Sequence, residues 1–228
     1  MSTTVAFDTG GLWGLGADYL GRPVAPQLIE GGRTLLLASL ASAALAQLCG
    51  VGIGLWLTMK PWGYAIVRFA LDLILILPMI VVSLVFYAAA GASIMAVIPL
   101  AALLTVPFTS RYYQAAATPL VTTGFFEQAL VAGDRPMMAV IREVLPVLKR
   151  VILVEFGYST ITAIYILATV SFLGTQSEES GFLWSAMVSQ NLVGFALNPW
   201  SVLAPLVAII AVTLPLNMLI DSVREQRS

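Results

Sequence analysis

Long apolar runs alternate with short polar segments along the whole chain. Five of these runs are long enough to cross a bilayer as helices, which takes roughly 20 residues each. They cover about residues 33–58, 64–90, 92–110, 147–173 and 199–220. Because each run is continuously apolar rather than alternating, the pattern predicts an all-α bundle of about five membrane-spanning helices and disfavours a β-barrel.

The composition supports a polytopic membrane protein. Hydrophobic residues make up 59% of the 228 positions and charged residues 10%, whereas soluble domains carry about 25% charged residues. The sequence predicts an extracytoplasmic N-terminal segment over residues 1–32 and a transmembrane domain over residues 33–228. Residues 1–32 have neither the early basic residues nor the apolar core of a signal peptide.

The same composition excludes several classes of function. The net charge of −1 argues against nucleic acid as a partner. Cys49 is the single cysteine and histidine is absent, so the chain has no disulfide framework, no thiolate metal cluster and no imidazole for acid–base catalysis. The sequence also lacks the G-x-x-x-x-G-K-[ST] phosphate loop. We therefore expect no metal site, no cofactor and no catalytic residue in this chain.

Lysine and arginine set the expected orientation, because basic residues concentrate on the cytoplasmic side of a membrane protein. With five spans, one side holds nine of them, namely Lys60, Arg68, Arg111, Arg135, Arg142, Lys149, Arg150, Arg224 and Arg227. The other side holds only Arg22 and Arg33. The C-terminus and the segment of about residues 111–146 are therefore predicted to be cytoplasmic, and the N-terminus to be outside. Trp184 and Trp200 fit an aromatic belt at the outer surface.

The predicted cytoplasmic segment contains an unusually polar stretch, EQALVAGDRPMMAVIREVLP, at residues 127–146. A short amphipathic helix is expected to begin at Thr123 as its cap and to end at Gly133. A second helix is expected to begin with Asp134 as its cap and Pro136 at an early helical position, where the missing N–H costs nothing.

Pro146 is expected to form a kink or boundary before the fourth span. The result is a helix, a glycine turn and a second helix, a shape that suits docking into a groove on a cytoplasmic partner. The alternative is a solvated loop that only connects two spans.

The spacing of this stretch carries a family resemblance. It reads E-x-A-x-x-x-G, with V-L-P ending thirteen residues after the glycine, and its key positions are Glu127, Gln128, Ala129, Gly133, Asp134, Leu145 and Pro146. The pattern resembles the signature cytoplasmic loop of binding-protein-dependent ABC importer permeases. That family usually reads Glu-Ala-Ala, and Gln128 stands in the middle position here.

Further positions extend the resemblance over roughly residues 15–227. The family's N-terminal spacing is matched by Gly16, Asp18, Gly21, Arg22, Val24, Gly31 and Arg33. Later matches are Asp72 before Pro78, Arg111 after Pro107, VSFLG at 170–174, NPW at 198–200, and Asn217, Asp221 and Arg224. Together they resemble the C-type permease subunit of the dipeptide, oligopeptide and nickel importers.

The resemblance implies a type I ABC importer permease in the bacterial inner membrane, a transport subunit and not an enzyme. It implies a second permease in a heterodimer, two ATPase subunits or domains that bind ATP and Mg, and an extracytoplasmic solute-binding protein. Solute would cross by alternating access, driven through the loop at about 111–146. The alternative function is a non-ABC channel subunit or scaffold whose loop binds another partner.

The sequence departs from the family pattern in three ways, and the last two bear on the solute. The chain begins just after the place where the family's additional N-terminal span would end. Leu167 stands where a glutamate is expected, and the outer loop lacks the family's Gly-Leu-Gly and Pro-Pro sequence. The solute is therefore left open among peptides, nickel and metal-chelate or opine-like compounds.

Glu155 is the candidate residue of a translocation path. It lies nine residues past Pro146, about 13 Å along a helix, and therefore within the apolar layer. A charge near a helix centre costs roughly 2.5–3.5 kcal/mol, so Glu155 should face the bundle interior or water. It either forms a structural hydrogen bond to a neighbouring helix or lines the path of a cationic or amine-bearing solute.

Other polar residues are expected to stabilise the helices. Arg68 and Asp72 are four residues apart on one helix and are expected to pair near the cytoplasmic surface. Asn217, Asp221 and Arg224 share one face of the last helix. They are expected to anchor its inner end by hydrogen bonds to neighbouring helices.

Overall fold

The computed structural model describes residues 5–10, 12–60, 62–90, 93–173 and 183–225. The α-helices in this part of the chain are α1 (Val24–Thr58), α2 (Tyr64–Ile76), α3 (Met79–Ala90), α4 (Ile94–Ala117), α5 (Gly124–Val131), α6 (Pro136–Ala139), α7 (Leu145–Val147), α8 (Lys149–Leu173), α9 (Trp184–Asn191) and α10 (Trp200–Glu225). Short 3-10 turns and one π-helical turn, Val140–Val144, connect them.

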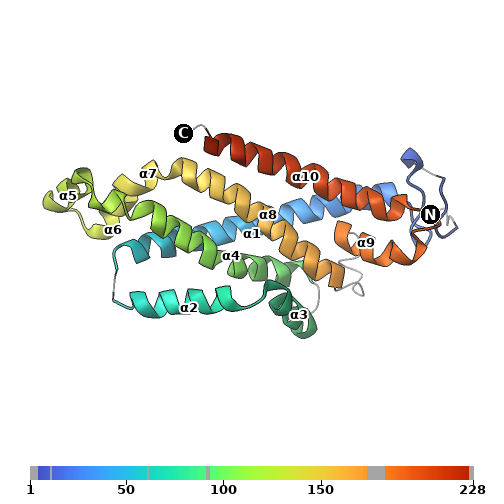
Figure 1. The fold of residues 1–228 in the computed structure, drawn as a ribbon, viewed down its shortest axis with the longest axis horizontal. Helices are drawn as coiled ribbons and strands as arrows, with labels where there is room; N and C mark the ends of the chain where they lie inside the picture. The colour runs from blue at the N-terminus through green and yellow to red at the C-terminus, as the bar shows by residue number, and fades with distance from the viewer. Residues whose placement is uncertain (1–4, 11, 61, 91–92, 174–182, 226–228) are drawn as a thin grey trace.

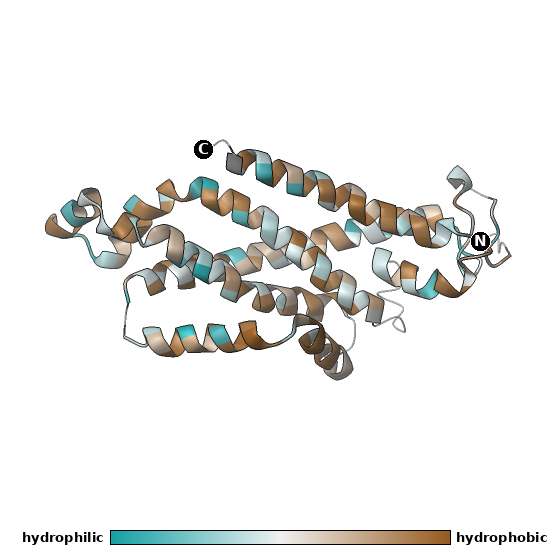
Figure 2. Cartoon of the chain, in the orientation of Figure 1, coloured by the Kyte–Doolittle hydropathy of each residue, from teal (hydrophilic) through white to brown (hydrophobic). Residues whose placement is uncertain are grey.

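The long helices form an elongated bundle. α1, α4 and α8 pack together along its length, and α2 and α10 flank them (Figure 1). The N-terminus lies at one end of the bundle, whereas α5, α6 and the C-terminus lie toward the other (Figure 1). Figure 2 shows hydrophobic residues along the lengths of α3 and α10, as the bilayer requires.

The fold class predicted from the sequence is confirmed. Within the described residues, four helices are long and apolar enough to cross a membrane, and the bent pair α2–α3 supplies a fifth span when it is counted as one. The first span begins at Val24, nine residues before the predicted start. Its 35 residues make a helix about 52 Å long, which reaches well beyond the apolar layer.

The second span is broken rather than continuous, unlike the single run predicted over residues 64–90. Its two parts, Tyr64–Ile76 and Met79–Phe86, meet at an angle of 86°. The cause lies at Leu77 and Pro78, because a residue before proline is driven out of the α region. Leu77 accordingly has an extended backbone, with φ −72° and ψ 126°.

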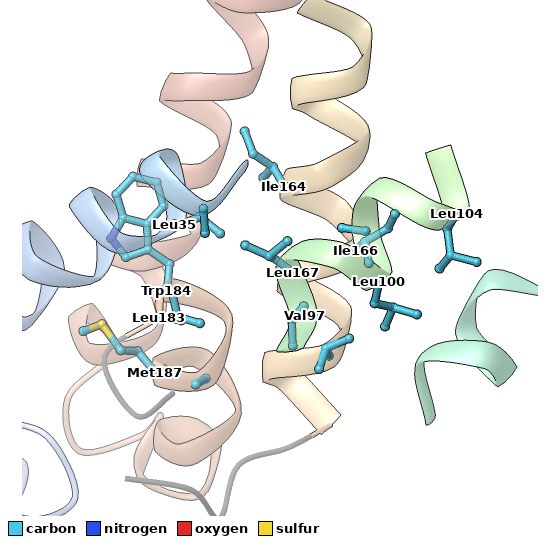
Figure 3. Packing of buried hydrophobic residues seen from close by; sticks show 14 of the residues in the cluster. Leu35, Val97, Leu100, Leu104, Ile164, Ile166, Leu167, Leu183, Trp184 and Met187 are labelled. Carbon is cyan, nitrogen blue, oxygen red and sulfur yellow. The ribbon is translucent and has the colours of Figure 1, made fainter. Parts of the chain in front are cut away.

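The half of the bundle nearer the N-terminus is filled by a cluster of buried side chains from α1, α4, α8 and α9 (Figure 3). Leu35, Leu167 and Trp184 meet there, and Leu167 is fully buried. The indole N–H of Trp184 donates to the carbonyl of Leu28 at 2.7 Å. The predicted place of Trp184 in an aromatic belt is therefore wrong: α9 folds back against α1, which turns this tryptophan into the core.

Close approach of α1 and α4 depends on a glycine. A Cβ added at Gly54 would lie 2.6 Å from the Ser110 carbonyl oxygen and 2.7 Å from the Cβ of Tyr113. By contrast, a Cβ at Gly52 on the same helix would meet nothing within 4 Å. Small residues let membrane helices approach closely and gain packing energy. Gly54 therefore allows this close approach, as does Gly50, where an added Cβ would clash with Thr109 of α4.

The N-terminal segment is fixed to its end of the bundle by a buried carboxylate. Asp18 accepts hydrogen bonds from the backbone N–H groups of Leu20 and Arg22, at 2.9 and 2.7 Å. It also accepts from the Arg22 guanidinium at 2.8 Å and from the Gln27 amide at 3.1 Å. Asn198, which precedes α10, donates to two backbone carbonyls of the same segment at 3.0 Å each. The N-terminal motif of the sequence thus forms a compact hydrogen-bonded turn around Asp18 with a structural role.

Candidate coupling site

The polar stretch between α4 and α8 folds into a compact unit, residues 124–147, which we call the coupling element. It contains α5, α6, the π-helical turn Val140–Val144 and α7. The element projects from the end of the bundle opposite to the N-terminus (Figure 1). The sequence predicts its two-helix form, and the first helix has the predicted extent between Thr123 and Gly133.

A Schellman motif ends α5. Gly133 has a positive φ of 96°, and its N–H donates to the Leu130 carbonyl at 3.1 Å. The next N–H, of Asp134, reaches back to the Ala129 carbonyl at 3.1 Å. This pair of bonds is the pattern that a left-handed residue after a helix creates. Glycine adopts that conformation without a steric penalty, so Gly133 has the predicted turn role.

The second helix begins one residue later than predicted. Arg135 occupies the cap position of α6 and Pro136 is its first residue. Asp134 is therefore not the cap; its carboxylate lies 3.4 Å from the Arg142 guanidinium and forms an ion pair. This contact joins the residue after the Gly133 turn to the π-helical turn Val140–Val144.

Pro146 marks the boundary with the fourth span, as the sequence predicts. The backbone widens into the π-helical turn directly before Leu145 and Pro146. Because proline has no N–H and crowds the preceding turn, it interrupts regular helix geometry. Regular helix resumes at Lys149 and runs to Leu173.

Buried apolar side chains connect the coupling element to the spans. Phe126, Val140 and Val144 of the element pack in one cluster with Leu55 of α1 and Tyr113 of α4. Protein interiors are close-packed and transmit displacement rather than absorb it. A force applied to the coupling element is therefore passed to α1, α4 and α8.

The opposite face of the coupling element is exposed and partly apolar. Val131 is 89% exposed, and other exposed apolar side chains are Phe125, Leu130, Met138 and Ile141. Among the positions of the family signature, Glu127, Gln128 and Pro146 are exposed and Ala129 and Leu145 are half-buried. Large exposed apolar patches are typical of surfaces that bind a protein or a membrane.

Glu155 lies on α8 and points into the subunit. Only 9% of the residue is exposed, and it lies four residues before Ser159 on the same helix. Tyr113 of α4 donates to the Gln47 amide oxygen of α1, and the Gln47 amide donates to Ser159 at 3.1 Å. Glu155 therefore lies one helical turn from a buried polar cluster that joins three helices. In the described part of the chain no hydrogen bond reaches its carboxylate.

The predicted pair of Arg68 with Asp72 is wrong. Asp72 forms its ion pair with Arg111 of α4, and Arg68 donates to the Tyr64 hydroxyl at 2.6 Å. The prediction considered one helix only, whereas α2 lies alongside α4, so a partner across the helix interface was available. The ion pair joins the bent span to the helix that leads into the coupling element.

The polar residues of α10 behave differently from one another. Asp221 accepts a hydrogen bond from the Tyr158 hydroxyl of α8 at 3.1 Å, which is an anchor of the predicted kind. Asn217 instead donates to the Thr213 carbonyl of its own helix at 2.9 Å, so its predicted bond to a neighbouring helix is wrong. The side chain of Arg224 lies outside the described residues.

No group of three or more potential metal-ligating residues gathers within the described ranges. The side chains there instead form packing clusters, ion pairs across helices and the exposed face of the coupling element. This arrangement suits a membrane component that is moved by a partner.

Comparison with known proteins agrees with this arrangement. The family model described as "Binding-protein-dependent transport system inner membrane component" matches residues 50–226. The chain is 25% identical over 212 residues to the glutathione transport system permease protein GsiD of Pectobacterium atrosepticum, covering 92% of this chain and 70% of that protein. It is 27% identical over 216 residues to GsiD of Shigella dysenteriae serotype 1, with the same coverage.

A putative peptide transport system permease protein of Brucella suis biovar 1 is 26% identical over 225 residues, covering 98% of this chain and 76% of that protein. These relatives are C-type permeases of the oligopeptide group. The family match removes the alternative of a non-ABC channel subunit or scaffold, because it covers the coupling element and four of the predicted spans. The chain belongs to the binding-protein-dependent transport system inner membrane components, the permease subunits of ABC importers.

Proposed function

We propose that this chain is one of two permease subunits of an ATP-driven importer for short peptides, and that its ATPase docks on the coupling element. Family membership already makes it a multi-pass inner-membrane permease that is not itself an enzyme and that works with a separate ATPase and a binding protein. The proposal adds the docking surface, the orientation, the second permease and the class of solute.

The exposed apolar face of the coupling element is the observation that carries the docking proposal. Val131 and its exposed apolar neighbours lie beyond the end of the spans, where water would otherwise surround them. The buried face of the same element is joined to α1 and α4. An ATPase bound to the exposed face would therefore move the spans directly, as alternating access requires.

Basic residues support the proposed orientation. Arg135 and Arg142 lie on the coupling element, and Lys149 and Arg150 follow it at the start of α8. The positive-inside tendency supports a cytoplasmic location for this end. The hydrogen-bonded N-terminal turn around Asp18 would then face the binding protein on the outer side.

The relatives support peptides as the solute. Two of the relatives described above are named for glutathione transport and one for peptide transport. Nickel and the metal-chelate or opine-like compounds, which the sequence also leaves open, have no such support. Exposed apolar side chains along α2, α3 and α10 leave surface for lipid and for a second permease.

Glu155 takes a structural role in this proposal. Glu155 is buried within one subunit, whereas a path residue would face the space between two permeases. The neighbouring Gln47, Tyr113 and Ser159 supply a polar surrounding for it. We therefore infer that Glu155 stabilises the contact of the three helices.

A pair of matched substitutions tests the docking proposal. Val131→Arg places a charge on the exposed face of the coupling element, and Val193→Arg places the same charge at a site that is 97% exposed near the other end of the bundle. Each complex would be purified through a tag on this chain, and the co-purified ATPase quantified. We expect Val131→Arg to lose the ATPase and Val193→Arg to retain it. Full retention by Val131→Arg would exclude docking at this face.

A further inference from the structure

A polar pocket opens between α2 and α4 near the end of the bundle that carries the coupling element. It has a volume of about 260 Å³ and is lined by Arg68, Arg111, Gln114, Ala115 and Thr118. Arg68 lies four residues after the start of α2, and Arg111 lies six residues before the end of α4. Two helices from different spans thus bring two guanidinium groups to one cavity.

The pocket carries an excess of positive charge and of hydrogen-bond donors. Asp72 neutralises one of the two arginines through its ion pair with Arg111. Within the described part of the chain, Arg68 makes one hydrogen bond, to the Tyr64 hydroxyl, although a guanidinium has five N–H donors. The Gln114 amide already donates to the Leu57 carbonyl and the Tyr64 hydroxyl, at 3.4 and 3.3 Å. The remaining donors of Arg68 suit an anion with several acceptor oxygens.

The pocket lies near the first turn of α2, at the depth expected for lipid headgroups. Arg68 lies about 6 Å along the helix axis from its first residue. Trp62, just before the helix, is 97% exposed, as expected of a tryptophan at the membrane interface. Beyond Arg68 the exposed side chains of α2 are apolar and include Phe69, Leu73 and Ile76. A headgroup in the pocket would thus have an apolar surface beside it for acyl chains.

We propose that this pocket binds the phosphate of an anionic phospholipid, with the acyl chains lying along the exposed apolar face of α2. Basic pockets between membrane helices on the cytoplasmic side bind such headgroups. A soluble phosphate would use the same donors, but it would leave the adjoining apolar surface of α2 unused. An apolar helix of another subunit would bury the Arg68 charge without a partner, at a large cost.

The test compares Arg68→Gln with Lys149→Gln in the complete importer complex. Lys149 is an exposed cation at the start of α8, toward the same end of the bundle but outside the pocket. Complexes would be placed in nanodiscs of phosphatidylcholine with and without phosphatidylglycerol, and retained lipid would be measured by native mass spectrometry during stepwise delipidation. A parallel series would contain millimolar inorganic phosphate.

The wild-type complex should retain phosphatidylglycerol in preference to phosphatidylcholine. Arg68→Gln should weaken that retention by about fivefold or more, the effect of one lost cationic contact, whereas Lys149→Gln and inorganic phosphate should leave it unchanged. Unchanged retention in Arg68→Gln, or an equal loss in both variants, would overturn the proposal. Displacement of the lipid by inorganic phosphate would assign the pocket to a soluble anion instead. Loss of a protein subunit from Arg68→Gln with lipid retained would assign it to a protein interface.

Discussion

Gly133 offers a direct test of how the shape of the coupling element serves transport. We compare Gly133→Leu with Gly124→Leu, at the first residue of α5. A Cβ at either glycine would meet nothing within 4 Å, but only Gly133 has a positive φ, of 96°. The two variants therefore add the same side chain to open space and differ in backbone strain.

The expected effect of Gly133→Leu follows from that strain. Holding a residue with a side chain in a sparsely populated backbone region costs on the order of 1–3 kcal/mol. This corresponds to a shift of about 5- to 150-fold in the equilibrium between the native turn and its alternatives. The Schellman bonds from Gly133 and Asp134 would be lost together, and the two halves of the coupling element would no longer keep their relative position.

The assay measures solute-stimulated ATP hydrolysis and solute uptake by the complete importer in proteoliposomes. Gly133→Leu should insert into the membrane normally but lose most of its uptake and its stimulated hydrolysis. Gly124→Leu should keep both, because leucine is well tolerated in a helix. If both variants transported equally well at equal expression, the turn at Gly133 would not be needed for coupling.

Three further predictions concern packing, topology and the buried acid. Gly54→Val should destabilise the purified permease by about 1–3 kcal/mol, because the added methyl groups overpack the helix contact, and should lower its melting temperature. Gly52→Val should not have this effect. Equal melting temperatures of the two variants would contradict the close α1–α4 contact. In a cysteine-free background, a membrane-impermeant thiol reagent added outside intact cells that lack the partner ATPase should label Val193→Cys and spare Val131→Cys; the reverse pattern would refute the orientation. Glu155→Gln should assemble and keep its uptake kinetics, and a lower apparent affinity for solute with normal assembly would instead place Glu155 in the path.

Much of the fold follows from hydrophobic pattern and local backbone rules. The five apolar runs correspond to α1, the α2–α3 pair, α4, α8 and α10. The turn at Gly133 and the boundary at Pro146 were also predictable, because glycine and proline constrain the backbone through their own covalent structure. These features depend on neighbours in sequence, so one sequence is enough to find them.

Features that depend on the approach of distant segments were not predictable in the same way. Asp72 pairs with Arg111 rather than Arg68 because α2 lies beside α4, and the sequence alone offers both arginines. Trp184 is buried because α9 folds back against α1, although its position near a span end is typical of an interfacial residue. The exposed apolar face of the coupling element likewise became visible only when its buried face was known.

ATP-driven uptake of labelled short peptides is the measurement that tests the account most directly. Proteoliposomes would contain this chain, its partner permease and its ATPase, with binding protein outside and ATP inside, and glutathione would be one of the peptides compared. The account predicts accumulation against a gradient that requires ATP, the binding protein and this chain. Peptide flux that proceeds without ATP, or the absence of accumulation for every peptide despite a complete and ATP-hydrolysing complex, would contradict it.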